Sequence, residues 1–152
     1  MNKELLQFIQ SQQLLSIASV DENAKPWIAN VYFSSDKNLN LFFVSSENTK
    51  HSKNIARNPE VSFSTSWYHP SNLTNRKSIQ GTGICEKIDD PKMILKFLKN
   101  HYKYFPLWKS LITLENIQNK IIESRPYIIK PKYIKFWNDE LYGEEGVGEF
   151  EF

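Results

Sequence analysis

The residues best suited to chemistry lie together in one stretch, Ser45–Pro59. Hydroxyl side chains come first, at positions 45, 46 and 49. Basic side chains follow, at Lys50, His51, Lys53 and Arg57. An apolar run leads into this stretch, so a strand would deliver these groups to the start of a short helix, where free N–H groups and the helix dipole attract anions. The stretch predicts a bound phosphate; the alternative interpretation is a solvated basic helix between two strands.

Length and composition limit the elements that could position such a site. A chain of 152 residues fits one domain with a real core, so we expect a single domain over residues 1–152. The net charge of +2 argues against a nucleic-acid or acidic-lipid partner. A single cysteine, Cys85, cannot form an internal disulfide, which favours a reducing compartment and predicts a cytoplasmic protein. We find no signal peptide and no apolar run of membrane-spanning length.

Hydrophobic periodicity predicts a mainly β fold of about six antiparallel strands in a small barrel that is closed or nearly closed. The expected strands are Leu14–Val20, Trp27–Ser34, Leu39–Ser45, Val61–Trp67, Ser78–Ile88 and Pro126–Trp137, the last interrupted by Pro131. The expected helices are Asn2–Gln13, which would cover one end of the core, Thr49–Asn58 capped by Asn48, Pro91–Tyr104 capped by Asp90, and Leu111–Glu123. Tyr68–Lys77 reads as a loop, and the acidic tail after Asn138 carries no expected element.

Two features inside these elements need an explanation of their own. Gly81 and Gly83 share one face of a strand, which predicts a bulge, a sharp bend, or a close approach by a ligand or backbone. His101 lies on the apolar stripe of Pro91–Tyr104. We interpret it as a core or interface histidine, because no partner ligands at metal spacing occur elsewhere, and we expect no metal site.

The order of these elements resembles the pyridoxamine 5′-phosphate oxidase-like FMN-binding split-barrel superfamily. The resemblance runs over about residues 14–88 and returns near residues 133–138. Within the superfamily the chain looks most like a group of small uncharacterised bacterial proteins. That closer similarity is carried by Trp27–Asn30, Phe43–Ser46, Glu47–His51, Ile79–Gln80 with Gly83, and Tyr104–Pro106.

The resemblance implies FMN as the cofactor. In the family, hydroxyl residues and two adjacent basic residues hold the FMN phosphate, and here that basic pair falls on Lys50 and His51. The second strand's backbone would edge the flavin ring, and the third strand would pass beside it. The residues implied to bind FMN are Ala29, Asn30, Val31, Tyr32, Val44, Ser45, Thr49, Lys50, His51 and Gln80.

The chain also departs from the true oxidases. Their pattern ends in an Arg-x-His type segment for the substrate phosphate, whereas residues 139–152 contain no Arg and no His. We therefore expect an oxidoreductase acting on another, unidentified small molecule, with no catalytic residue identifiable. The alternatives are a flavin carrier without turnover and a barrel that binds single-stranded nucleic acid, which the low charge disfavours. Haem or deazaflavin as the ligand remains open, since relatives of this fold use both.

The resemblance further implies a homodimer with the flavin between protomers. The aromatic content of 14% is high for one small barrel, and aromatic side chains are enriched at interfaces. A cluster at Tyr102 and Tyr104–Trp108 follows the long helix. It would either reach into the partner's flavin site or pack onto its own barrel.

Overall fold

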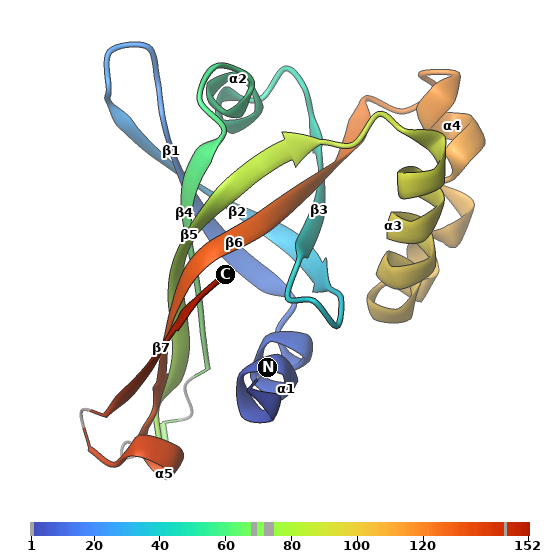
Figure 1. Cartoon of the computed structure of the whole chain (residues 1–152). Helices are drawn as coiled ribbons and strands as arrows, with labels where there is room; N and C mark the ends of the chain where they lie inside the picture. The colour runs from blue at the N-terminus through green and yellow to red at the C-terminus, as the bar shows by residue number, and fades with distance from the viewer. Residues whose placement is uncertain (1, 68–69, 72–74, 145) are drawn as a thin grey trace.

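The chain folds into an antiparallel β-barrel with helices at both ends and along one side (Figure 1). This computed structural model describes residues 2–67, 70–71, 75–144 and 146–152. The strands within these ranges are β1 (Leu14–Val20), β2 (Pro26–Ser35), β3 (Leu41–Ser46), β4 (Glu60–Trp67), β5 (Lys77–Lys87), β6 (Ser124–Asn138) and β7 (Val147–Glu151). The helices are α1 (Lys3–Ser11), α2 (Lys50–Arg57), α3 (Pro91–Tyr104), the 3-10 helix η1 (Pro106–Ser110), α4 (Leu114–Gln118) and α5 (Asp139–Tyr142).

One seam closes the barrel. The sheet runs in the order β3-β2-β1-β4-β5-β6-β7, and β3 also pairs with β6, so that six strands form a ring. In this seam Leu41 lies opposite Ile129 and Ser46 lies opposite Ser124. The mainly β, six-stranded antiparallel barrel expected from the sequence is therefore confirmed. The seventh strand, β7, was not expected; it pairs with the other half of β6, from Tyr133 to Trp137.

The barrel interior holds the main core. Alternation along the strands turns Leu15 and Ile17 of β1, and Phe33 of β2, inward, where they are fully buried. α1 closes one end of the barrel with Leu5 and Ile9, which confirms the covering role expected for this helix. α2 lies at the opposite end in Figure 1.

A second core lies outside the barrel. Phe42 of β3 and Ile128 of β6 point away from the interior, and helices α3 and α4 pack over them. Phe97, at the centre of the α3 stripe, is fully buried and lies against Phe42, with 6.1 Å between ring centroids. The apolar residues that recur along α3 with the helical period of 3.6 are the ones that pack against the outer face of β3 and β6.

Several boundaries differ from the sequence-based prediction. Thr49, rather than Asn48, caps α2, because Thr49 is the last residue with extended backbone and its side chain accepts from the Ser52 N–H. β3 starts at Leu41 because Leu39 adopts a positive φ of 64° in the preceding turn. The expected helix Leu111–Glu123 does form, but it is much shorter than predicted.

This helix, α4, covers five residues. Thr113 caps its start, and the chain leaves helical geometry at Asn119 and at Lys120, where φ is 54°. The expected loop Tyr68–Lys77 falls partly outside the described residues, and Lys77 itself begins β5.

The two strand glycines allow close backbone contact. A Cβ at Gly83 would lie 2.5 Å from the Lys130 carbonyl oxygen, and one at Gly81 would lie 2.5 Å from the Phe63 ring. The β5–β6 register shifts between Thr82 and Gly83, so both the bulge and the close approach are confirmed. Pro131 does not end β6; it lies between the segment of β6 that pairs with β3 and the segment that pairs with β7, where a missing N–H is tolerated.

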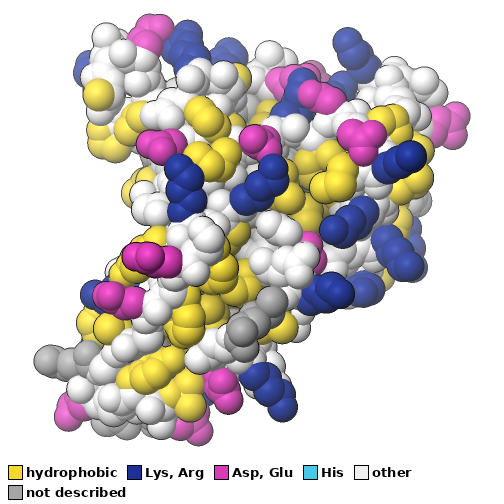
Figure 2. Space-filling model, viewed as in Figure 1, with side chains coloured by type: hydrophobic (Ala, Val, Ile, Leu, Met, Phe, Trp, Pro, Cys, Tyr) yellow, Lys and Arg dark blue, Asp and Glu magenta, His cyan; other side chains and the backbone are white. Residues whose placement is uncertain are grey.

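Charge is unevenly distributed over this fold. In the space-filling view Lys and Arg side chains gather over the side that carries α3 (Figure 2). Across the described ranges, no helix is long and apolar enough to cross a membrane. In the same ranges no three His, Cys, Asp or Glu side chains cluster as metal ligands would.

Candidate functional site

The predicted phosphate stretch forms the junction between β3 and α2. β3 ends at Ser46, a tight turn follows, and α2 begins at Lys50. The Thr49 hydroxyl donates to the Ser46 carbonyl oxygen at 2.9 Å and accepts from the Ser52 N–H at 3.3 Å. An α-helix leaves its first N–H groups without carbonyl partners, so those of Lys50 and His51 remain open to an anion.

His51 turns inward from this helix start and joins the hydroxyl groups. Its Nε2 atom lies 2.7 Å from the Ser45 hydroxyl and 3.2 Å from the Thr49 hydroxyl. The ring is buried, and this burial lowers the pKa of His51 below its ordinary value. His51 is therefore a neutral hydrogen-bonding group at pH 7, and of the expected basic pair only Lys50 carries a charge.

Lys50 points to a different place from His51. Its Nζ atom lies 4.6 Å from the ring centroid of Trp27, at the start of β2. Trp27 is 41% exposed, so a cation and an aromatic side chain meet beside the helix N-terminus. Trp27 was not among the expected site residues. Its contact with Lys50 joins two segments that are distant in sequence, so no local pattern could predict it.

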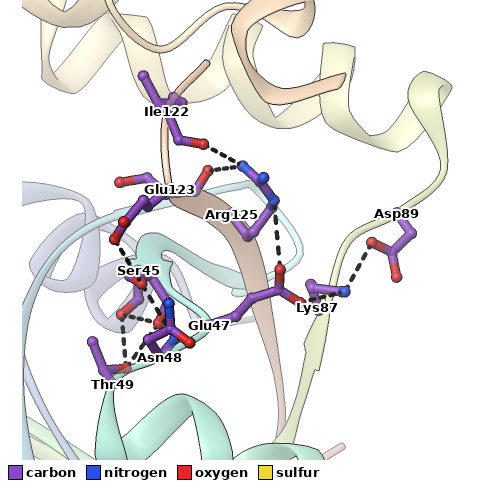
Figure 3. A network of polar contacts seen from close by, with 11 residues as sticks. Ser45, Glu47, Asn48, Thr49, Lys87, Asp89, Ile122, Glu123 and Arg125 are labelled. Carbon is purple, nitrogen blue, oxygen red and sulfur yellow. Dashed lines mark hydrogen bonds and ion pairs between the residues drawn. The ribbon is translucent and has the colours of Figure 1, made fainter. Parts of the chain in front are cut away.

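An ion-pair network holds the turn that carries these groups (Figure 3). The Glu47 carboxylate accepts from Lys87 Nζ at 2.7 Å and lies 3.6 Å from Arg125 Nε. The hydrogen bond from Lys87 lowers the pKa of Glu47. Arg125 also donates to the carbonyl oxygens of Ile122 and Ser124, at 2.7 and 2.9 Å. The two cations offset the negative charge that Glu47 would otherwise place near an anion site.

The remaining expected site residues lie elsewhere on the barrel. Asn30 and Tyr32 of β2 point outward, and Asn30 accepts from the Ser16 hydroxyl at 2.7 Å. Gln80 of β5 lines a shallow hollow of about 370 Å³ on the same outer face, together with Ile28. The structure thus groups Ser45, Thr49 and His51 closely, turns Lys50 toward Trp27, and places Asn30, Tyr32 and Gln80 on the outer sheet face.

Three of the expected residues are apolar and offer little side-chain surface to a ligand. Val31 is buried in the barrel core. Val44 packs against the helical core under α3 and α4. Ala29 lies on the same strand face as Val31 and is partly buried. Any contact from these residues to a ligand would come through their backbone, as expected for the edge of a flavin ring.

The buried reactive side chains are poor catalysts. The Cys85 thiol is buried, and this burial raises its pKa to about 12, so the nucleophilic thiolate is scarce at neutral pH. His101 is fully buried, and its Nδ1 atom is 2.9 Å from the Ser34 hydroxyl. This agrees with a core histidine rather than a metal ligand.

The aromatic cluster after α3 packs onto its own chain. Phe105 and Trp108 stack on each other at 4.8 Å, and both rings meet Tyr32 edge-on at about 6 Å. The Tyr102 hydroxyl donates to the Ile112 carbonyl oxygen at 2.6 Å. Leu107, by contrast, is 90% exposed. The cluster thus packs onto its own barrel, and its contribution to a partner's flavin site stays a prediction.

Comparison with known proteins agrees with this architecture. The family model of pyridoxamine 5′-phosphate oxidase matches residues 1–138. A UPF0306 protein of Campylobacter jejuni is 26% identical over 115 residues, which cover 76% of this chain and 84% of that protein.

Two solved structures share the fold at low sequence identity. A heme binding protein from Mycobacterium smegmatis has a TM-score of 0.74 at 12% identity, over 99% of this chain and 59% of that one. The heme storage protein HutZ from Vibrio cholerae has a TM-score of 0.66 at 18% identity, over 95% of this chain and 91% of that one. Since the family model covers nearly the whole sequence, the chain belongs to the pyridoxamine 5′-phosphate oxidase family.

Proposed function

We propose that the chain binds FMN, with the phosphate at the start of α2, and acts as an FMN-dependent oxidoreductase on a small molecule. The observation that carries this proposal is the joint presence of Lys50, the Ser45 hydroxyl and the neutral His51 ring at one helix N-terminus. The ring of the flavin would follow the edge of β2 and the outer face that Asn30 and Gln80 share.

The donors at this position fit a phosphomonoester. The open N–H groups of the first helical residues provide directional hydrogen bonds, and Lys50 provides a point charge. Ser45 is already hydrogen-bonded to His51, so its hydroxyl is held in position before any ligand arrives. The nearby carboxylate of Glu47 is paired with Lys87, and this pairing reduces its repulsion of a bound anion.

FMN would supply the electron transfer, as flavins do in general. The chain's own residues would bind the phosphate, orient the ring and exclude water. This division suits a chain in which, among the described residues, the thiol is protonated and both histidines are neutral and buried. Reduction of the bound flavin by NADH or NADPH would support an enzyme, whereas a flavin that stays oxidised would indicate a carrier without turnover.

Haem is the main competing ligand, because two proteins of the same fold are described as heme proteins. Haem iron is commonly held by a histidine, cysteine or methionine. Within the described residues both imidazoles, His51 and His101, are buried, and so is the Cys85 thiol. His69 lies outside the described residues. The phosphate-type donors at α2 therefore favour FMN, and the visible spectrum of the purified protein distinguishes the two chromophores.

Lys50→Ala should weaken FMN binding roughly 10- to 150-fold, or about 1.5–3 kcal/mol, the scale of a hydrogen bond to a charged group. Quenching of flavin fluorescence during titration of the apo-protein measures this. Lys53→Ala is the matched control, because it removes an exposed lysine from the same helix.

Riboflavin, which lacks the phosphate, separates the two parts of the site. Riboflavin should bind more weakly than FMN and should not distinguish Lys50→Ala from the wild type. Equal affinity of the wild-type protein for FMN and riboflavin would remove the phosphate site from the proposal.

We also propose that two copies associate through the outer face of β1 and β2. Ile28 is 67% exposed and Tyr32 is 58% exposed, and the exposed Leu14 lies directly opposite Tyr32 in the strand pairing. Large apolar side chains exposed on one sheet face are typical of an interface. Because Asn30 and Gln80 occupy the same face, a second copy would cover the ring end of the flavin site.

Ile28→Glu should convert the dimer to a monomer in sedimentation at micromolar concentration, because it replaces an exposed apolar side chain on this face with a charge. Leu107→Glu is the control, since it puts the same charge on an exposed leucine of η1. A wild-type protein that sediments as a monomer, or an Ile28→Glu variant that remains a dimer, would contradict this interface.

Pyridoxamine 5′-phosphate is not the substrate in this proposal. The tail forms α5 and β7, and β7 lays Glu149 and Glu151 along β6. Carboxylates there would repel a second phosphate, and residues 139–152 offer no cation. The single buried cysteine, without a disulfide, agrees with the cytoplasmic location that forms part of the proposal.

A further inference from the structure

A second basic region lies on the far side of the fold from α2. It is a groove of about 660 Å³ between the end of α1, the β2–β3 turn and α3. The residues that line it are all of polar or charged type: Gln10, Gln13, Ser35, Asp36, Lys37, Lys96, Lys99, Asn100, Lys103 and Tyr104. No part of the proposed FMN site contributes to it, and the function proposed above does not use it.

Four lysines line this groove. Lys37 comes from the β2–β3 turn, while Lys96, Lys99 and Lys103 follow one face of α3. Among the described residues, none of the four makes an ion pair with a carboxylate within 4 Å, although eight such pairs occur elsewhere. The gathering of Lys and Arg side chains on the α3 side is visible in Figure 2.

The one acid that lines the groove is engaged in its own turn. The Asp36 carboxylate accepts from the N–H groups of Asn38 and Asn40 at 2.8 and 3.1 Å, and from the Asn40 side chain at 3.0 Å. These hydrogen bonds direct the carboxylate toward the turn backbone. The groove therefore carries an excess of positive charge, four lysines against one carboxylate, although the whole chain carries only +2.

The groove is also held in shape. Asn100 donates to the Ser35 carbonyl oxygen at 3.0 Å, and the Tyr104 hydroxyl donates to the same oxygen at 3.2 Å. Both side chains come from α3, and Ser35 ends β2, so the helix is tied to the strand beside the groove. The α3 lysines are therefore set at a fixed separation from Lys37 of the adjoining turn.

We propose that this groove binds a small polyphosphate anion, of the class of pyrophosphate and nucleoside di- and triphosphates. Lysine is a common phosphate ligand that acts as a point charge, and four such charges match the multiple charges of a polyphosphate. A volume of about 660 Å³ falls in the usual range for small-molecule pockets. The low net charge and the single aromatic lining residue, Tyr104, disfavour a single strand of nucleic acid, which needs a basic track with stacking platforms.

Calorimetric titration of the full chain at about 50 mM salt tests this, since screening is weak at that ionic strength. The probes are inorganic phosphate, pyrophosphate and adenosine triphosphate, each added to the apo-protein and to the FMN-saturated protein. Pyrophosphate and the triphosphate should saturate one site per chain, at least about tenfold more tightly than phosphate, in both forms of the protein.

The double variant Lys99→Gln with Lys103→Gln should weaken pyrophosphate binding about tenfold, as expected when two partly exposed charge contacts are lost. Its matched control is Lys92→Gln with Lys109→Gln. That pair removes the same charge from the same α3–η1 stretch, outside the groove, and should change the affinity less than about twofold.

Three outcomes would overturn the proposal. An equal loss in both double variants would mean general attraction to a basic surface. Absence of saturable binding would mean that there is no site. Loss of pyrophosphate binding on saturation with FMN, or in Lys50→Ala alone, would assign the anion to the α2 site; that result would leave the FMN proposal intact. A failure of FMN to bind would leave the groove result unaffected.

Discussion

Acidification from pH 7 to pH 4 should remove about 3 kcal/mol of folding free energy through His101 alone. Burial lowers the pKa of His101 from 6.5 to about 4 in the folded protein. The unfolded chain therefore takes up a proton near pH 6.5, and the folded chain does so only near pH 4. The stabilising contribution of the neutral ring is complete above pH 6.5 and is lost as the pH falls toward 4.

The surroundings of His101 explain this sensitivity. The ring lies among Phe97, Phe105 and Trp108, with centroid distances of 4.8, 4.7 and 5.5 Å, and is hydrogen-bonded to the Ser34 hydroxyl. Its Nε2 atom is buried without a hydrogen-bond partner. No carboxylate faces it among these contacts, so a proton added to the ring would be buried without compensation.

Urea unfolding at a series of pH values measures this effect. His101→Gln is the comparison, because an amide can keep a hydrogen bond to Ser34 and does not titrate between pH 4 and 7. His51, whose pKa is also lowered by burial, acts in the same direction in both proteins and cancels in the difference. Parallel stability curves for wild type and His101→Gln would show that His101 does not carry the acid sensitivity.

Phe43→Ala should cost about 3–5 kcal/mol of folding free energy, the range observed when a buried phenylalanine is truncated. Phe43 is fully buried and stacks on Tyr127, with ring centroids 5.1 Å apart and planes inclined by 11°. It belongs to β3 and Tyr127 to β6, so the stack spans the seam that closes the barrel. The cavity would open in the centre of the core, where the surrounding strands cannot collapse to fill it.

Phe152→Ala is the matched control for this change, because it removes the same atoms from a side chain that is exposed at the end of the chain. Chemical unfolding of both variants gives the two free energies. We expect the control to lie within about 0.5 kcal/mol of the wild type, as surface substitutions usually do. A similar small loss for Phe43→Ala would contradict the packing described here.

The elements with local signals could be predicted from the sequence. α3 begins at Pro91 after its Asp90 cap, as expected, because capping and helix-start preferences are short-range. β1 has the expected limits, Leu14–Val20, since alternation and a polar turn define them. The β3–α2 junction was also foreseen, because the order of hydroxyl and basic residues is itself local.

The features missed by the sequence reasoning depend on contacts between distant segments. β7 is short and acidic and contains a glycine, so its sequence does not signal a strand. It forms because its backbone pairs with the edge of β6 and because Phe150 packs against the barrel core. The Glu47–Lys87 pair joins residues 40 positions apart. The Trp27–Lys50 contact arises from the packing of α2 over the barrel end, which no spacing in the chain encodes.

The seam between β3 and β6 also bears on how the chain reaches this structure. Leu41 and Ile129 pair across 88 intervening peptide units, whereas β1–β2, β2–β3 and β4–β5 are formed by near neighbours in sequence. The entropy of closing so long a loop must be overcome before the pairing contributes, so the seam should be the late and slow step of folding. Until it closes, β3 and β6 both expose unpaired edges. In that interval two chains can exchange strands. Refolding at high protein concentration should therefore favour a strand-exchanged dimer, and refolding at low concentration a barrel closed within a single chain.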